Sequence, residues 1–226
     1  MPADAPSTPR VKICGLTHND DARLAERLGA DLLGFVLSRG FGRSVPEDAA
    51  SSVAFGTGVE RVAVLVDEPV DRAARLARSI DAAVIQLHGS ESPETVERLR
   101  SAGEWRVWKA VRARSLEDVA RAVLDYGSLA DGLLLEGWKA GVTGGGGARL
   151  ELGPDEVRRE MAGGPALILA GGLTPDNVAD AVAQFGPDIV DVSSGVETTP
   201  GRKNPELVRR FVAVVKANET RSWKHI

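Results

Sequence analysis

Eight short apolar runs alternate with eight longer stretches of helical periodicity along this chain. This alternation predicts a single-domain α/β protein built as a closed (β/α)8, or TIM, barrel. Two further observations support the prediction: no linker separates the units, and 226 residues is an ordinary length for one barrel domain. An open doubly wound sheet is the alternative. Nucleotide-binding sheets of that kind usually carry a GxGxxG first turn, and the first turn here reads Cys-Gly-Leu-Thr-His.

The predicted strands are short, rich in β-branched residues and bounded by Gly, Pro or Asp. In chain order they are residues 11–14, 32–37, 61–66, 83–87, 106–111, 132–135, 166–170 and 189–192. A leader, residues 1–9, precedes the first strand. Its three prolines and small polar residues give it little apolar surface to bury, so we expect it to be disordered.

The predicted helices lie between these strands, at residues 20–28, 46–54, 70–79, 93–102, 116–126, 154–161, 175–184 and 205–217. The first follows Asn19 and opens with two acidic residues, which is a helix-start signal. Several others open with Pro in the first turn after Ser, Thr, Asn or Gly, where the missing N–H has no partner to lose. The barrel is therefore expected to span residues 10–217, with a polar tail at 218–226.

Composition and charge exclude several classes of function. The net charge of −4 and the lack of a basic stripe argue against a nucleic-acid partner. No apolar run approaches the length of a membrane span, and the start lacks a signal-peptide pattern. One cysteine cannot form an internal disulfide, so we expect a cytoplasmic protein. The three histidines and the cysteine show no metal-ligand spacing, and we expect no metal site.

A thiol and a carboxylate are the candidate catalytic groups. Cys14 stands at the carboxyl end of the first predicted strand, and Glu136 stands at the same end of the sixth. In a barrel, side chains at these strand ends face the ligand site. A lone cysteine is more often a buried packing residue, but its position here favours acid/base chemistry.

Two loops rich in Gly and Ser predict a phosphate site. Gly171 and Gly172 follow the seventh strand, and Ser193, Ser194 and Gly195 follow the eighth, where many barrels bind phosphate through backbone N–H groups. The alternative is that the glycines only form turns.

Arg43, His88 and Asp191 are candidate substrate-binding residues. Arg43 offers a fork of donors to an anion, while His88 is equally suited to a structural hydrogen bond, and Asp191 either faces the barrel interior or solvent. A glycine run made of Gly144, Gly145, Gly146 and Gly147 is either a mobile flap over the ligand or a flexible connection.

An ordered set of motifs also resembles a known family. The set is Lys12-Ile13-Cys14-Gly15-Leu16-Thr17, Gly34-Phe35-Val36, Gln86-Leu87-His88-Gly89, Lys109-Ala110-Val111, Gly171-Gly172-Leu173 and Asp191-Val192-Ser193-Ser194-Gly195-Val196-Glu197. It resembles the phosphoribosylanthranilate isomerases of tryptophan biosynthesis. The resemblance implies a cofactor-free Amadori rearrangement of a phosphosugar, with Cys14 as the base, tuned by neighbours such as Lys12, and with Arg43 binding substrate.

Departures from the family pattern all fall near the predicted site. The family usually has Asp where this chain has Glu136, and the loops at residues 41–43 and 148–152 also differ. Two other functions therefore stay open: a divergent barrel enzyme for a related amine-linked phosphosugar or anthranilate-like ligand, or a catalytically weak phosphosugar-binding partner subunit. The resemblance is compatible with a monomer or a homodimer.

Overall fold

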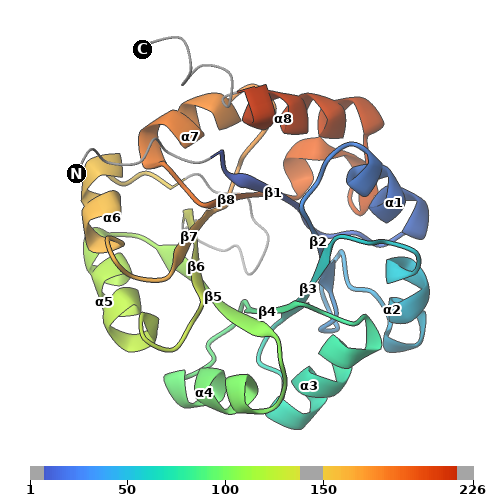
Figure 1. Ribbon diagram of the computed structural model, residues 1–226, viewed down its shortest axis with the longest axis horizontal. Helices are drawn as coiled ribbons and strands as arrows, with labels where there is room; N and C mark the ends of the chain where they lie inside the picture. The colour runs from blue at the N-terminus through green and yellow to red at the C-terminus, as the bar shows by residue number, and fades with distance from the viewer. Residues whose placement is uncertain (1–7, 138–149, 218–226) are drawn as a thin grey trace.

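A closed barrel of eight parallel strands forms the centre of the molecule (Figure 1). It is seen in a computed structural model that describes residues 8–137 and 150–217. Each strand pairs with the next, and β8 pairs with β1, which closes the sheet and confirms the predicted fold. The strands are β1 (Arg10–Ile13), β2 (Leu32–Val36), β3 (Glu60–Leu65), β4 (Val84–Leu87), β5 (Arg106–Ala113), β6 (Gly132–Gly137), β7 (Ala166–Leu169) and β8 (Ile189–Val192).

The helices surround the barrel on its outside (Figure 1). They are α1 (Asn19–Arg27), α2 (Glu47–Ala54), α3 (Val70–Ser79), α4 (Pro93–Ser101), α5 (Leu116–Tyr126), α6 (Pro154–Glu160), α7 (Val178–Phe185) and α8 (Pro205–Ala217). Side-chain caps begin three of them. The Ser92 hydroxyl accepts from the Thr95 N–H, the Ser115 hydroxyl accepts from the Asp118 N–H, and the Asn204 amide oxygen accepts from the Glu206 and Leu207 N–H groups at the start of α8. None of the described helices is both long and apolar enough to cross a membrane.

The core has two layers, because successive strand residues point alternately outward and inward. The larger layer lies between barrel and helices, and the smaller one fills the barrel interior. Trp108 is the largest fully buried side chain and belongs to the interior layer. Gly132 on the next strand makes room for it, since a Cβ there would lie 2.9 Å from the Trp108 ring and 2.6 Å from Ile168.

Three predicted boundaries differ from the structure by two or three residues. Helix α7 begins at Val178, not at residue 175, because Thr174–Asn177 form a turn in which the Asn177 amide oxygen accepts from the Thr174 N–H at 2.8 Å. Strands β5 and β6 are each two residues longer than predicted, with Arg112 paired to Glu136 in register. Glu136 therefore lies inside a strand, not after it.

A short segment after β8 was not predicted as regular structure. A 3-10 turn, η1 (Ser194–Val196), leads into a two-stranded antiparallel hairpin of β9 (Glu197–Thr199) and β10 (Arg202–Lys203). Gly201 makes the turn between these strands with a positive φ of 82°. The predictions for a leader, a tail and a flap at Gly144–Gly147 fall almost wholly on residues outside those that the structure describes.

Candidate functional site

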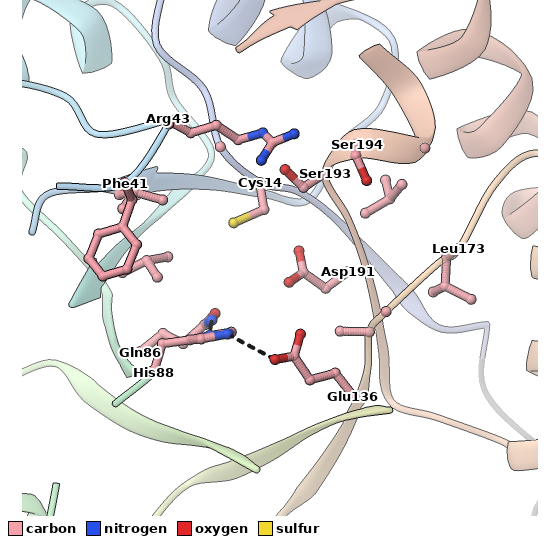
Figure 2. Close-up of a pocket in the computed structure, with 18 of the residues that line it drawn as sticks. Cys14, Phe41, Arg43, Gln86, His88, Glu136, Leu173, Asp191, Ser193 and Ser194 are labelled. Carbon is pink, nitrogen blue, oxygen red and sulfur yellow. Dashed lines mark hydrogen bonds and ion pairs between the residues drawn. The ribbon is translucent and has the colours of Figure 1, made fainter. Parts of the chain in front are cut away.

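A cavity of about 290 Å³ opens at the carboxyl ends of the barrel strands. Its lining includes every predicted site residue that the structure describes: Cys14, Arg43, His88, Glu136, Gly171, Gly172, Asp191, Ser193, Ser194 and Gly195. Phe41, Gln86 and Leu173 also line it (Figure 2). Residues from six sequence segments therefore meet in one place, although Cys14 and Asp191 are 177 positions apart in the chain.

Cys14 lies beside a buried ammonium group. Lys12 precedes it by two residues and so shares its face of the barrel. The Lys12 side chain is fully buried, and its Nζ donates to Asp191 Oδ1 at 3.0 Å. Gly34 on β2 makes this arrangement possible, because a Cβ at that position would lie 2.8 Å from the Cys14 sulfur and 3.1 Å from Lys12 Nζ. Asp191 therefore faces the barrel interior and not solvent.

Burial and charge act in opposite directions on Cys14. Burial raises the pKa of its thiol, Lys12 lowers it and Asp191 raises it, and the net pKa is above the usual 9.0. Burial lowers the pKa of Lys12, but Asp191 and Cys14 together raise it by more. The net pKa is above the usual 10.5, so the ammonium stays charged. At neutral pH the structure thus holds a protonated thiol next to a Lys12–Asp191 ion pair.

Two side chains contact Glu136: Arg112 from the neighbouring strand β5, and His88 from the loop after β4. Its Oε1 lies 3.0 Å from Arg112 Nε and 3.3 Å from His88 Nε2. Burial raises the pKa of this carboxyl, but the hydrogen bonds from His88 and Arg112 outweigh it, and the net pKa is below the usual 4.5. Glu136 is therefore a carboxylate, and Figure 2 shows it across the cavity from Cys14, with Asp191 between them.

Arg43 is held at the cavity edge by an ion-pair cluster. Its Nε and Nη2 lie 2.8 Å and 2.6 Å from the two carboxylate oxygens of Glu197. Lys203 Nζ lies 2.8 Å from the same carboxylate and 3.1 Å from the Ser193 carbonyl oxygen. The two parallel contacts between Arg43 and Glu197 form a bidentate pair, which fixes the plane of the guanidinium group. A lysine at this position could not form such a pair. Three formal charges leave one net positive charge beside the Ser193 loop.

The two predicted phosphate loops have backbones that favour glycine. Gly171 and Gly172 have φ values of 87° and 59°, which other residues rarely adopt. A Cβ on Gly195 would overlap the Leu173 carbonyl oxygen, so the two loops approach each other at backbone distance there. At the three glycines only main-chain atoms can face the cavity, and the side chains of Ser193, Ser194 and Leu173 line it beside them (Figure 2).

Several functional contacts were missed by the sequence reasoning, which did not single out Gln86, Arg112, Glu197 or Lys203 as site residues. A signal existed for Gln86, since it stands two residues before His88 and must share its inward face. Nothing local indicates that Glu197 pairs with Arg43, because 154 positions separate them. Within residues 8–137 and 150–217, no group of three His, Cys, Asp or Glu side chains is placed to hold a metal ion.

Comparisons with known proteins show the family of this chain. The family model described as N-(5'phosphoribosyl)anthranilate (PRA) isomerase matches residues 11–214. A Rubrobacter xylanophilus protein named N-(5'-phosphoribosyl)anthranilate isomerase is 39% identical over 213 residues, covering 92% of this chain and 99% of the relative. The crystal structure of phosphoribosyl anthranilate isomerase from Thermotoga maritima superposes with a TM-score of 0.84 at 31% identity, covering 92% of this chain and 99% of that one.

A further crystal structure shows such an isomerase with a bound ligand. It is phosphoribosyl anthranilate isomerase in complex with reduced 1-(o-carboxyphenylamino)-1-deoxyribulose 5-phosphate, with a TM-score of 0.80 and 30% identity over 92% of this chain and 99% of that one. A family model that covers most of the barrel, together with relatives of this identity and coverage, shows that this chain belongs to the N-(5'-phosphoribosyl)anthranilate isomerase family.

Proposed function

We propose that this protein converts N-(5'-phosphoribosyl)anthranilate to 1-(2-carboxyphenylamino)-1-deoxyribulose 5-phosphate, a cofactor-free Amadori rearrangement in tryptophan biosynthesis. The observation that carries the proposal is the placement of Cys14 and Glu136 on opposite sides of one cavity (Figure 2). Family membership supports the same reaction. A thiol and a carboxyl group facing one substrate provide the base and the acid that the rearrangement needs.

The reaction divides into two proton transfers. Glu136 gives a proton to the furanose ring oxygen; the C1'–O bond breaks with its electron pair going to that oxygen, and the nitrogen lone pair forms a C1'=N bond. The Cys14 thiolate then takes the C2' proton. The C2'–H electrons form a C1'=C2' bond while nitrogen regains its lone pair, and the resulting enol becomes the ketone by moving its hydroxyl proton to C1' through solvent.

Substrate binding is assigned to the opposite end of the cavity. The loops with Gly171, Gly172 and Ser193–Gly195 are proposed to bind the phosphate through main-chain N–H groups. Arg43, which Glu197 orients, is proposed to bind a second anionic group of the substrate. His88 and Asp191 line the cavity between these ends and are in reach of the sugar. A cytoplasmic location is part of the proposal, consistent with a chain that has one cysteine.

Substitution of the two proposed catalytic residues tests this function. Cys14→Ala and Glu136→Ala are each expected to lower turnover of N-(5'-phosphoribosyl)anthranilate by about a hundredfold or more. Both variants should keep the circular dichroism spectrum and unfolding transition of a folded barrel, because both residues lie at the loop-bearing end. Glu97→Gln, on the exposed face of α4, is the matched control and should keep full activity.

Complementation separates this function from its alternatives. The unmodified chain should restore growth to a tryptophan auxotroph that lacks the isomerase. Failure to do so would overturn the proposal. If the purified chain then bound a phosphorylated aminoketose without turning over the substrate, the partner-subunit reading would replace it.

A further inference from the structure

Among the residues that the structure describes, the partners of Glu136 all contact one of its two carboxylate oxygens. Arg112 Nε and His88 Nε2 both contact Oε1, at 3.0 Å and 3.3 Å, and no described residue is hydrogen-bonded to Oε2. We propose that Gln86, His88 and Arg112 are positioning residues that hold Glu136 by Oε1 and leave Oε2 as the oxygen that donates the proton. This inference rests on the proposed function, in which Glu136 is the acid.

The two donors decide where a proton on Glu136 can sit. Arg112 donates its Nε–H to Oε1, and His88 Nε2 lies 3.3 Å from the same oxygen, so a proton on Oε1 would compete with both contacts. Oε2 keeps its lone pairs free of both donors. A proton that arrives on Glu136 is therefore expected on Oε2, while Oε1 remains anchored.

Gln86 determines which nitrogen of His88 carries the proton. Its side chain is 1% exposed, and its Nε2 lies 2.8 Å from His88 Nδ1. An amide N–H that donates to Nδ1 makes this nitrogen an acceptor, so the proton of the neutral ring is on Nε2, directed at Glu136. The charged groups that face His88 are Glu136 with Arg112 behind it, and Asp191 and Arg43 on other sides of the cavity.

If the Gln86 amide were turned the other way, the proton of His88 would be expected on the other ring nitrogen. Gln86 Oε1 is buried and has no hydrogen-bond partner among the described residues. A half-turn of the amide would place this oxygen against His88 Nδ1, which would then carry the proton. His88 Nε2 would become an acceptor and would no longer anchor a carboxylate. The His88 tautomer therefore decides between the two arrangements.

Strand register places Arg112 beside Glu136. The two residues are paired in the β5–β6 ladder, and Ala113 and Gly137 form the pair after them. Both side chains therefore lie on the same face of the sheet, where Arg112 Nε donates to Glu136 Oε1 at 3.0 Å.

Nitrogen-15 NMR of the histidine rings tests the tautomer without any substrate. The chain has three histidines, His18, His88 and His225, and the signal lost in His88→Gln identifies the one in the cavity. At pH 8 the His88 ring is expected as the Nε2–H tautomer, and Gln86→Leu should convert it to a mixture of tautomers. A Nδ1–H tautomer in the unmodified chain would overturn the inference.

Kinetics test whether the positioning acts through Glu136. Gln86→Leu and Arg112→Met are each expected to lower kcat about tenfold with KM changed less than about threefold. In a Glu136→Ala background, neither should lower the residual rate further, because the group they position is gone. A further tenfold loss in that background would show a structural role and overturn the inference.

Matched controls and the unmodified chain complete the design. Gln184→Leu and Arg98→Met make the same changes at exposed positions on α7 and α4 and should leave kcat unchanged. If the unmodified chain does not turn over N-(5'-phosphoribosyl)anthranilate, the proposed function fails, and the NMR result still decides the hydrogen-bond arrangement on its own.

Discussion

The two proposed catalytic residues rest in protonation states opposite to those that the reaction uses. The structure holds Cys14 as a thiol, because burial raises its pKa above the usual 9.0, and holds Glu136 as a carboxylate with a lowered pKa. The reaction needs a thiolate and a carboxylic acid. The resting form and the reactive form each hold one proton on these two groups, so their interconversion takes up and releases no net proton.

Because the resting and reactive forms carry the same number of protons, kcat/KM is expected to change little with pH over a broad range. Below the pKa of Glu136 both groups are protonated, and above the pKa of Cys14 both have lost their protons, so only the range between them contains the one-proton form. We expect kcat/KM to change less than about threefold from pH 7 to pH 8.5 and to fall only above about pH 9. Steady-state rates across this range check the prediction.

An alkaline limb centred near pH 7 would contradict it, since that would require a Cys14 pKa below the usual value. Exchange of Cys14 for Ser offers a control: a hydroxyl does not ionise in this range, so the residual rate of that variant should lack the alkaline limb assigned to the thiol.

At the scale of single elements, three strand pairs share one device at the end of the barrel opposite the cavity. The strand pairs are β1–β2, β5–β6 and β7–β8, and in each an aspartate stands just before the second strand: Asp31, Asp131 or Asp188. Each aspartate makes two hydrogen bonds to one residue near the start of the first strand, one through its carboxylate and one through its own N–H. Asp131 is representative: its carboxylate accepts from the Val107 N–H at 2.8 Å, and its own N–H donates to the Val107 carbonyl at 2.8 Å. The aspartate thus satisfies a backbone N–H that starts a strand and has no ladder partner.

Removal of this carboxylate is expected to destabilise the fold without changing catalysis. Asp131→Ala leaves the Val107 N–H buried without its acceptor, which costs about 1–3 kcal/mol of the free energy of unfolding. Urea unfolding measures this loss, and faster hydrogen exchange at the Val107 amide locates it. kcat should stay unchanged, because the device lies at the far end of the barrel from Cys14.

Arg100→Met is the matched control for that experiment. Arg100 pairs with Asp131 at 2.8 Å, but both side chains are partly exposed, so loss of this ion pair should cost less than about 1 kcal/mol. If the two variants lost equal stability, the ion pair and not the backbone contact would be the source.

Most elements were predictable from the sequence because hydrophobic period and helix-start residues act locally. Helices α3, α5 and α8 begin and end where predicted, and the strand at Ile189–Val192 does as well. The prediction failed where tertiary contacts decide. The Thr174–Asn177 turn delays α7, and the pairing of Arg112 with Glu136 extends β5 and β6, although neither is visible in a single apolar run.

For the candidate site, too, features with a local sequence signal were predicted, and those that depend on tertiary contacts were not. Cys14, Glu136 and the glycine loops are marked by their place at strand ends, and the cavity brings all of them together. The contacts that set their properties cross the barrel: Lys12 reaches Asp191, and Glu197 reaches Arg43. Such contacts depend on closure of the whole sheet, which local patterns do not describe.

At the scale of the whole molecule, carboxylates paired across distant segments link stability to pH. Folding lowers the pKa of Glu60, Glu136 and Glu197; burial alone would raise each value, but the hydrogen bonds and ion pairs with neighbouring Arg, Lys or His side chains lower it more. Each group adds stability that is complete above its unfolded pKa, near 4.5, and is lost as pH falls through the lower folded value. The free energy of unfolding should therefore be level near neutral pH and should decline below about pH 5.

Glu197→Gln separates this effect from general acid sensitivity. The variant removes one carboxylate that titrates, so its free energy of unfolding at pH 7 should be lower than that of the unmodified chain, and its further decline between pH 7 and pH 4 should be smaller. Urea unfolding at pH 7 and at pH 4 measures the free energy of unfolding of each protein and hence its decline between the two pH values. Glu97→Gln, made on an exposed helix face, should leave the decline as it is in the unmodified chain. An equal decline in all three proteins would show that Glu197 binds its proton alike in the folded and unfolded states, because only a difference between those two states makes stability depend on pH.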